Sequence, residues 1–352
     1  MTILLTENPG YNSYINSLII AYQKAGHTVI CGSNNFFWSD FKPDILHIHW
    51  PERLYKWYVL KKEDKQQLKE IEKRLRWYRQ NGSKIIYTVH NLLPHNTKAP
   101  ENDSKFYNLI IEYADLIHHH CPKSIDLVAE KFPAAKEKPN IVANHGDYLI
   151  DYRDVSKETA RRILGIPQKS YVILNFGSQQ SYKGNSLINK TFSKLEIKNK
   201  FLLTAGNFRY NSFPFPKNYL LKALNYLREK KISSTKKYIL KPIPPKEIAV
   251  IFGASDIVFL GHSSGLTSGV LNLAATFSKP VVFPDIGCFE YQMKDWIYEK
   301  YEVGISSAAK KALEKLYQCI IEHKKNLYNM VWLANNRWDY YVDILLNELK
   351  NL

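Results

Sequence analysis

The chain has 352 residues, of which 45% are hydrophobic and 13% aromatic. These values exclude a wholly disordered protein and allow two folded domains. The formal net charge of +16 indicates either a lysine-rich solvated surface or an anionic partner such as nucleic acid, acidic lipid or a phosphorylated substrate. No apolar run approaches the roughly 20 residues that cross a bilayer, and the N-terminus lacks a basic region. We therefore expect a cytoplasmic protein, soluble or peripheral to a membrane.

Buried-strand patterns alternate with helical patterns along the first 150 residues. The expected strands cover 2–6, 28–31, 45–49, 84–89, 116–119 and 140–143. The expected helices cover 14–25, 61–80, 104–114 and 124–131. Strands that alternate with helices are typical of a parallel sheet covered on both faces.

Residues 53–84 carry eleven basic and four acidic side chains, a net charge of +7, with aromatic residues between the basic ones. Such a segment fits either a mixed-charge helix packed on a sheet or a contact with an anionic membrane surface. No nucleic-acid motif accompanies it, so we expect no nucleic-acid partner.

The second half repeats the alternation. Its expected strands cover 171–177, 201–205, 237–240, 257–260 and 280–283. Its expected helices cover 184–195, 218–229, 245–252, 268–277 and 308–324. The charged stretch 151–169 indicates a domain junction, and a final aromatic helix over 327–349 is expected to pack back on the first domain. The prediction is an α/β chain of two Rossmann-like, doubly wound domains facing across a cleft, with 1–150 and 151–330 as the domains and 331–352 as the returning helix.

Polar side chains crowd the ends of several first-half strands, which is where open α/β sheets bind ligands. The loop with Gly10 and Tyr11 follows the first strand, His49 ends the third, and His90 with Asn91 ends the fourth. The loop fits either a ligand contact or an ordinary turn, whereas His90 favours a functional role. The run His118-His119-His120 does not predict a metal site, because adjacent strand residues point to opposite faces.

The second half holds two candidate anion sites. One is the Ser/Gly loop from His262 to Gly269, which opens a helix and leaves backbone N–H groups available for phosphate. The other is Lys183, which stands beside Gly184 at the start of a helix after the strand 171–177. Together they predict a diphosphate site.

These motifs resemble those of the GT-B glycosyltransferases, in particular the retaining, glycogen-synthase-like group and its bacterial polysaccharide-assembly branch. The branch motifs H-x-H-W-P and T-V-H-N-x-x-P-H stand here as His47-Ile-His49-Trp50-Pro51 and Thr88-Val-His90-Asn91-Leu-Leu-Pro94-His95. The branch pattern F-G-x-I-R-x-Y-K-G appears as 176–184, and S-G-x-x-x-x-A with a later P-V appears as 268–281. His145-Gly146 matches the junction motif P-H-G, with Asn144 in place of proline.

The resemblance implies a transferase that moves a hexosyl-type sugar, with retention, from a nucleotide-diphosphate sugar to a glycan or polyprenyl-diphosphate-linked acceptor in surface polysaccharide or capsule assembly. It implies no cofactor and no metal, because lysine and a helix N-terminus supply the positive field. His90 and Lys183 are the implied catalytic residues. The implied donor-diphosphate residues are Lys183, Gln180, Thr267, Ser268, Gly269 and Val270. The implied sugar and acceptor residues are Gly10, Tyr11, His49, Asn91, His145, His262 and Gly265.

The chain departs from the family pattern at three positions. Gln180 replaces the arginine that partners the lysine, and Gly265 and Leu273 replace two glutamates that many relatives carry for the donor sugar and ribose. Arg209 or Lys241 would then supply the missing positive charge. The departures keep open a catalytically weakened or non-catalytic sugar-nucleotide or carbohydrate-binding relative. A nucleotide-sugar epimerase or a sugar phosphorylase on the same fold is a further alternative, although no pair of cleft carboxylates supports an epimerase.

Overall fold

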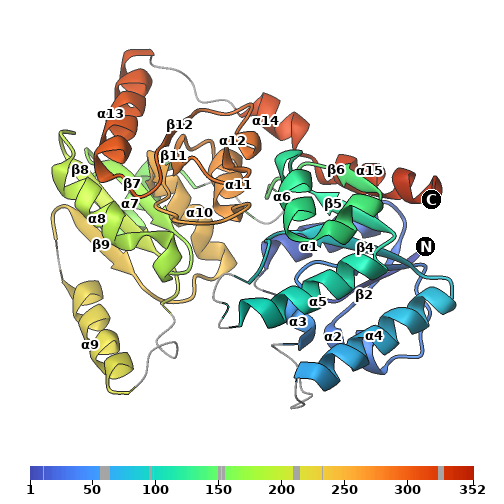
Figure 1. The fold of residues 1–352 in the computed structure, drawn as a ribbon. Coiled ribbons are helices and arrows are strands. Elements are labelled where there is room, and N and C mark those ends of the chain that lie inside the picture. The colour runs from blue at the N-terminus through green and yellow to red at the C-terminus, as the bar shows by residue number, and fades with distance from the viewer. Residues whose placement is uncertain are drawn as a thin grey trace. The chain divides into compact units, whose positions relative to one another are not determined.

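The computed structural model describes residues 1–10, 12–55, 64–94, 97, 99–149, 152, 155–208, 215–231, 233–323 and 329–352. The chain divides into two compact units (Figure 1). The first unit comprises Met1–Asp147 and Asn335–Leu352, and the second comprises Tyr148–Ala334.

The first unit is built on a six-stranded parallel sheet with the order β2-β1-β3-β4-β5-β6. Its strands are β1 (Thr2–Leu5), β2 (Thr28–Cys31), β3 (Ile45–Ile48), β4 (Lys84–Val89), β5 (Leu116–His119) and β6 (Asn140–Val142). Its helices are α1 (Ser13–Lys24), α2 (Ser33–Trp38), α3 (Glu52–Tyr55), α4 (Asp64–Gln80), α5 (Pro100–Tyr113), α6 (Lys123–Lys131), the 3-10 helix η1 (Pro133–Glu137) and α15 (Trp338–Lys350).

The last helix of the chain, α15, lies in the first unit beside α1. Its buried residues join a core made with α1 and one face of the sheet, which includes Ile3, Ile86 and Leu345. The Tyr341 hydroxyl hydrogen-bonds the Tyr14 hydroxyl at 2.8 Å. A buried tyrosine pair of this kind satisfies both polar tips inside an apolar layer and so fixes α15 on α1.

The second unit has a six-stranded parallel sheet with the order β12-β11-β10-β7-β8-β9. Its strands are β7 (Tyr171–Phe176), β8 (Lys200–Ala205), β9 (Lys236–Ile239), β10 (Ile257–Phe259), β11 (Val281–Pro284) and β12 (Tyr298–Tyr301). Its helices are α7 (Lys157–Leu164), η2 (Ser181–Lys183), α8 (Asn185–Lys194), α9 (Lys217–Lys230), α10 (Pro245–Ala254), α11 (Gly269–Thr276), α12 (Phe289–Gln292), α13 (Ser306–His323) and α14 (Met330–Asn335).

Both faces of the second sheet are covered by helices (Figure 1). Alternate residues of β7 join two different cores, with Val172 and Leu174 in the one made with α10 and α11, and Ile173 in the one made with α8 and α13. This division is what a strand period of two produces in a sheet that is buried on both sides.

The strand order reverses once in each sheet. In the first unit β1 lies between β2 and β3, and in the second unit β7 lies between β8 and β10. At such a switch point the loops after the two central strands turn to opposite faces, which leaves room for a ligand at the carboxyl ends. The topology therefore directs attention to the loops after β1 and β3 and to the loops after β7 and β10.

The structure departs from the sequence expectations in several places, which include the short helices α2, α3 and α12 that were not expected. The single helix expected over 327–349 is wrong, because α14 and α15 are separated at Asn336 and Arg337. Residues 157–164, expected as part of a charged junction, form α7, and β12 was not predicted. Within the residues that the structure describes, no helix combines the length and the apolar character that crossing a membrane requires.

A buried ion pair offers a test of how the second unit is held together. Arg161 is 3% exposed; it donates to Asp256 Oδ2 (2.6 Å) and to the Ala254 carbonyl (3.1 Å). Removing Arg161 leaves the Asp256 carboxylate with only a half-exposed cation beside it and leaves the Ala254 carbonyl without this donor, so we predict that Arg161→Met lowers the free energy of unfolding by about 3 kcal/mol. Lys157, half exposed, pairs with the same carboxylate, and Lys157→Met should cost about 1 kcal/mol or less. Urea unfolding measures both changes, and equal losses would contradict the prediction.

Candidate functional site

The first unit gathers a layer of buried polar rings at the carboxyl end of its sheet. Tyr14 lies at its centre, with ring centroids 5.3 Å from His49, 4.8 Å from His90 and 4.8 Å from His145. His120 adds a fourth imidazole at 5.7 Å from the Tyr14 ring. Three of the predicted residues, His49, His90 and His145, thus lie together around one tyrosine.

His90 is held on two sides. Trp50 stacks on its ring with centroids 4.1 Å apart and an interplanar angle of 16°. His90 Nε2 hydrogen-bonds His49 Nδ1 at 3.1 Å. Burial lowers the pKa of both imidazoles well below its usual range. His90 is therefore a neutral imidazole in a fixed orientation, suited to hydrogen bonding rather than to presenting a positive charge.

Further hydrogen bonds, made by His47 and His118 within the sheet, lie beneath this layer of rings. Thr88 Oγ1 bonds His47 Nε2 at 2.7 Å and His118 Nδ1 at 3.0 Å. His47 Nδ1 bonds the Tyr22 hydroxyl at 3.0 Å, and His118 Nε2 bonds the Ala143 carbonyl at 3.0 Å. These hydrogen bonds fix the orientation of the His47 and His118 rings. Burial lowers the pKa of both histidines, so each ring is neutral near pH 7.

The three consecutive histidines point to opposite faces, as their strand alternation predicts. His118 and His120 both hydrogen-bond the Ala143 carbonyl from one face. His119 instead bonds Ser124 and Asn140 on the other face. In the described part of the chain no group of three or more His, Cys, Asp or Glu side chains is placed to hold a metal ion.

Glu7 is a member of this edge of the sheet that the sequence did not single out. It follows β1, is 3% exposed, and accepts from the Thr6 hydroxyl (3.0 Å) and, less closely, from the Trp50 N–H (3.3 Å). Burial raises its pKa to about 7. A carboxylate directly after a buried strand was the signal available in the sequence. Glu7 therefore fixes the backbone of the tryptophan that stacks on His90.

The remaining residues predicted for this unit are Gly10 and Asn91, which the structure describes, and Tyr11, which it does not. The Gly10 N–H and carbonyl bond the Asn16 amide (3.0 and 2.7 Å), which closes the loop after β1. Asn91 is half-buried directly after His90. Tyr11, and His95 of the family motif, lie outside the described residues.

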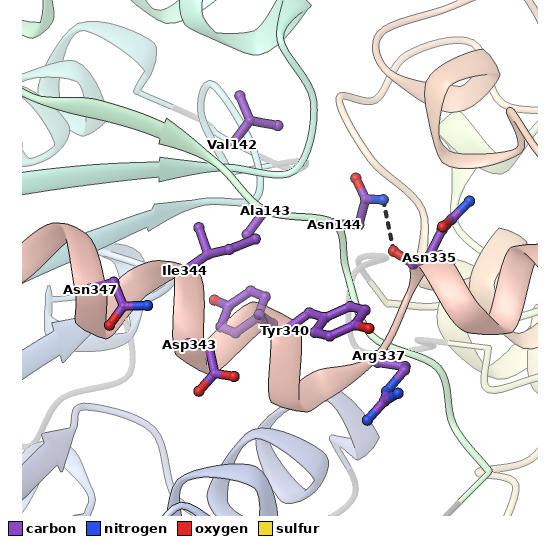
Figure 2. A pocket seen from close by; sticks show the side chains of 10 residues that line it. Val142, Ala143, Asn144, Asn335, Arg337, Tyr340, Asp343, Ile344 and Asn347 are labelled. Atoms are coloured by element: carbon purple, nitrogen blue, oxygen red, sulfur yellow. Dashed lines mark hydrogen bonds between the residues drawn. The ribbon is translucent and has the colours of Figure 1, made fainter.

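Figure 2 shows a separate pocket of about 380 Å³ between α15 and the end of β6. Its walls carry amide, carboxylate and tyrosine side chains, and an Asn144–Asn335 hydrogen bond of 3.0 Å closes one side (Figure 2). The lining residues are Val142, Ala143, Asn144, Asn335, Arg337, Tyr340, Tyr341, Asp343, Ile344 and Asn347. No residue predicted for the site lines this pocket.

In the second unit the predicted Ser/Gly loop and short helix are present as β10, a loop and α11. Ser268 is the N-cap residue of α11, but its side chain does not cap the helix. Its hydroxyl is buried and has no hydrogen-bond partner in the described part of the chain. Gln292 Oε1 accepts from the Ser268 N–H at 2.9 Å and fixes the loop. A buried, unsatisfied hydroxyl at a helix start is a ready donor for an anion.

Lys183 lies close to the start of α11. A Cβ built on Gly177 would stand 3.7 Å from Lys183 Nζ and 3.6 Å from Val270 Cγ2, so the ammonium and the first turn of α11 both flank Gly177. Lys183 is half-buried, and burial lowers its pKa to about 8. No ion pair in the described residues involves Lys183. A desolvated cation without a carboxylate partner favours an anionic ligand.

Gly184 explains how Lys183 reaches this position. Its φ is +64°, and a Cβ there would stand 1.8 Å from the Gly261 carbonyl oxygen. Only glycine allows the loop after β7 and the loop after β10 to touch in this way. The two loops that flank the switch point are thereby packed backbone to backbone.

The other residues predicted for this unit surround the same loop. Gln180 Nε2 donates to Ser178 Oγ at 3.1 Å, and Thr267 is half-buried. His262 is 4% exposed, with its ring 5.7 Å from the Tyr182 ring. Gly265 packs near Phe289.

The structure also bears on the departures from the family pattern. Leu273 is 8% exposed and belongs to the apolar core, so its side chain offers no polar group to a ligand. Lys241, considered as a replacement charge, is paired with Glu247 at 3.3 Å. Arg209 lies outside the described residues.

Solved structures with the same architecture cover almost the whole chain. Sucrose-phosphate synthase from Thermosynechococcus elongatus matches with a TM-score of 0.73 at 14% identity, covering 99% of this chain and 98% of that one. The Anabaena protein HepE in complex with UDP and glucose matches with a TM-score of 0.71 at 13% identity, covering 100% and 99%. The chain has the GT-B fold. The expected pair of Rossmann-like domains is confirmed.

Comparison of sequences gives weaker matches than comparison of structures. No family model matches the chain. The D-inositol 3-phosphate glycosyltransferase of Corynebacterium glutamicum is 22% identical over 221 residues, which is 58% of this chain. The matched region spans half the length of that relative. A trehalose-6-phosphate protein from E. coli, bound with UDP-2-fluoro glucose, matches in structure with a TM-score of 0.69 at 9% identity, covering 100% and 99%.

The buried histidines of the first unit predict a loss of stability on acidification. Burial lowers the pKa of His47, His49, His90, His118, His119, His120 and His145. The unfolded chain therefore binds more protons below about pH 6.5, and each group costs up to about 1.4 kcal/mol per pH unit. Glu7, whose pKa is raised, acts in the opposite direction but is a single group.

We predict that the free energy of unfolding is several kcal/mol lower at about pH 5.5 than at about pH 7.5, because several histidines titrate in this interval. Urea unfolding at the two values measures the difference. His119, with a pKa lowered to about 4, supplies the control, since His119→Gln should reduce the pH dependence by about one proton. A stability that is flat or rises on acidification would show that the folded state protonates these rings.

The lowered pKa of Lys183 predicts how ligand affinity depends on pH. An anion at this site binds the protonated amine, so affinity is complete below about pH 8 and is lost above it. The dissociation constant of an anionic ligand held by this ammonium should rise about tenfold between pH 7 and pH 9. Isothermal titration calorimetry with UDP-glucose as the anionic probe measures it. Lys183→Arg stays charged throughout and should give a flat profile, and a flat profile for the unmodified protein would argue against the assignment.

Proposed function

We propose that the chain is a glycosyltransferase that moves a sugar from a nucleotide-diphosphate sugar to a glycan or lipid-linked oligosaccharide. The observation that carries the proposal is the half-buried ammonium of Lys183 near the first turn of α11, at the switch point of the second sheet. Among the described residues it has no carboxylate partner, and it lies 5.4 Å from the Tyr182 ring centroid. The GT-B fold and the UDP or UDP-sugar named with two of the similar structures support it.

In this proposal the donor diphosphate lies on the second unit. Lys183 and the N–H groups of Gly269 and Val270 contact its oxygens, and the Ser268 hydroxyl donates a further hydrogen bond. Transfer breaks the bond between the anomeric carbon and a diphosphate oxygen and forms a bond between that carbon and an acceptor hydroxyl oxygen, whose proton passes to the released diphosphate. Negative charge therefore accumulates on the leaving oxygen as the bond breaks. Positive charge and oriented dipoles placed there in advance stabilise the transition state without reorganisation. No metal or cofactor is required in this scheme.

Gln180, Thr267, His262 and Gly265 complete the proposed donor surface. Gln180 is neutral where the family pattern has arginine, so the cation contribution falls mainly to Lys183. The half-buried position of Lys183 partly compensates, because a charge in a less polar environment interacts more strongly with the diphosphate.

The first unit is proposed to contact the sugar and the acceptor through Gly10, Tyr11, His49, His90, Asn91 and His145. His90 would act as a neutral hydrogen-bonding group on the transferred sugar, held rigid by Trp50 and His49. A stacked imidazole with one nitrogen already engaged loses little conformational entropy on binding. This preorganisation is what a sugar-positioning residue requires.

Several finer features of the reaction rest on the family resemblance and remain part of the proposal. They are a hexosyl donor, retention of configuration, a polyprenyl-diphosphate-linked acceptor and a role in surface polysaccharide or capsule assembly on the cytoplasmic side of the plasma membrane. Contact with an anionic membrane through 53–84 is a further part of the proposal, and it rests on the basic and aromatic composition of that segment. Within that segment Lys65, Lys69 and Lys73 are exposed on α4, which is compatible with it.

A catalytically weakened or non-catalytic sugar-nucleotide-binding protein is the second candidate. The specific observation in its favour is the burial of Leu273 in the apolar core together with the absence of a side chain at Gly265. Neither position supplies a carboxylate to the donor. This candidate predicts binding of a nucleotide sugar without measurable transfer or hydrolysis.

The test is donor binding measured by thermal shift with a panel of UDP-, GDP- and ADP-sugars. One of them should raise the melting temperature, and Lys183→Ala should weaken its dissociation constant by about tenfold or more, the loss of a charge-assisted contact of roughly 1.5–3 kcal/mol. Lys190→Ala, an exposed lysine of the same unit, should leave the shift unchanged.

The result separates the two candidates from failure of the whole scheme. Binding followed by release of the nucleoside diphosphate in the presence of acceptor lipids supports the transferase. Binding without turnover supports the second candidate. If no nucleotide sugar shifts the melting temperature, or if Lys183→Ala behaves like Lys190→Ala, the proposed site is wrong.

A further inference from the structure

Helix α9 of the second unit exposes the side chains that a helix normally buries. Leu220, Leu224 and Leu227 are 62%, 50% and 63% exposed. With Ala223, which is also exposed, they follow the i, i+3, i+4, i+7 spacing of an apolar helix face. Tyr219 (64%) and Tyr226 (57%) border this face, and Phe215 (80%) precedes the helix.

The opposite face of α9 carries Leu221, which is half-buried, and Asn225, the one residue of the helix that is buried. Glu229 Oε1 accepts from the Leu240 N–H at 2.6 Å, directly after β9. The helix therefore contacts its sheet through a small surface, while Leu220, Leu224 and Leu227 are turned to solvent. It contacts β9, the edge strand, and extends beyond the sheet (Figure 1).

Cations surround the exposed apolar face. Lys217, Lys222, Arg228, Lys230 and Lys231 are all exposed, against a single acidic residue, Glu229, which is engaged at the sheet edge. The segment 215–231 thus carries a net charge of +4. Lysine and arginine stems extend over apolar surface while their heads stay in a polar layer.

An exposed leucine face of this size needs an occupant, because monomeric proteins rarely leave one open. A second copy of the chain would bring two helices of charge +4 together, and this repulsion opposes self-pairing. An anionic lipid surface satisfies both features at once, since acyl chains cover the leucines and acidic headgroups neutralise the cations. The interfacial position suits Tyr219, Tyr226 and Phe215 as well, because aromatic rings concentrate at that depth.

We propose that α9 is a membrane-interface helix, which lies in the headgroup region of an anionic bilayer with Leu220, Leu224 and Leu227 inserted. This surface is distinct from residues 53–84, which belong to the first unit. It rests on the proposed function only in the sense that a lipid-linked acceptor gives membrane attachment a purpose. The contact itself follows from the composition and exposure of α9.

The experiment is co-sedimentation of the full chain with phosphatidylcholine vesicles, with and without phosphatidylglycerol. We expect binding to the anionic vesicles that weakens with added salt. The variant Leu220→Gln/Leu224→Gln/Leu227→Gln should lower the partition coefficient by about tenfold or more, since glutamine keeps helix propensity and removes the inserted surface. Lys222→Glu/Lys231→Glu should abolish the preference for anionic vesicles.

Matched controls separate this helix from other exposed residues. Ile163→Gln/Ile321→Gln removes two exposed apolar side chains elsewhere in the second unit (61% and 50% exposed) and should leave vesicle binding unchanged. Lys65→Glu/Lys69→Glu/Lys73→Glu alters α4 and reports the contribution of the first unit. If only this α4 variant loses binding, the proposal for α9 is wrong. It is also wrong if the leucine variant and the lysine variant of α9 both bind vesicles as the unmodified chain does.

Two further readouts keep the outcomes distinct. Sedimentation velocity without lipid should show the same oligomeric state for the chain and the leucine variant, whereas a dimer that the leucine variant dissociates would overturn the proposal in favour of a self-association face. Circular dichroism and the donor-induced thermal shift should be unchanged in the leucine variant. Lys183→Ala should retain vesicle binding, so that loss of donor binding and loss of membrane binding test different claims.

Discussion

The parallel pairing of β7 with β10 is the constraint on which the candidate donor site depends. These strands are neighbours in the sheet although β8 and β9 come between them in the chain. Their following loops therefore meet at one edge, where the contact between Gly184 and the Gly261 carbonyl leaves no room for a side chain. Lys183 is positioned by that contact and α11 by the loop that follows Gly261. The cation and the helix start are neighbours because the strand order reverses there, not because they are close in sequence.

The first unit applies the same topology to a different purpose. The pairing of β1 with β3 and of β3 with β4 places Glu7, Trp50 and His90 at one edge. Here the polar groups hydrogen-bond one another and burial keeps the imidazoles neutral. The result is a rigid layer of rings whose geometry, rather than whose charge, is available to a ligand.

The apolar character of a segment decided how well its ends were predicted. Strands β2, β4 and β5 were predicted with their observed ends, because apolar runs between turn residues have few alternatives. This holds for the buried strands β4 and β5 and also for β2, which has no fully buried residue. β12 was missed because its sequence Tyr-Glu-Lys-Tyr has two charged residues at its centre and no aliphatic residue. The α7 segment was misjudged by its charge, although Ser156 caps the helix and Gly165 ends it in the left-handed region. Ser156 and Gly165 are typical helix-end residues, but the sequence interpretation gave more weight to the charged composition of the segment.

Other features could not be read from one sequence at all. The spacing of Leu220, Leu224 and Leu227 predicts a helix with an apolar face, and in a globular chain that face is assigned to the core. Only the fold shows that Asn225 and Glu229 make the inward contacts instead. Glu7 left one signal in the sequence, a carboxylate after a buried strand, but its hydrogen bond to Trp50, 43 residues away, is visible only in the fold. Periodicity states which residues share a face, but which way the face turns is decided by tertiary packing.

The buried titratable groups of the two units differ in their protonation states near neutral pH. Among the described residues the first unit buries seven imidazoles, and burial lowers the pKa of each, so these rings add no positive charge near neutral pH. Arg53, whose guanidinium lies 5.7 Å from the Trp50 ring centroid, is a cation beside this layer. In the second unit the half-buried ammonium of Lys183 has a pKa of about 8 and stays mostly protonated at the same pH. In the proposed scheme the Lys183 ammonium attracts the diphosphate, whereas the neutral rings offer hydrogen bonds. Stacking surfaces and fixed hydrogen-bonding groups of this kind suit the uncharged, hydroxyl-rich sugar. The proposed roles of the two units thus follow from the protonation states of their buried groups.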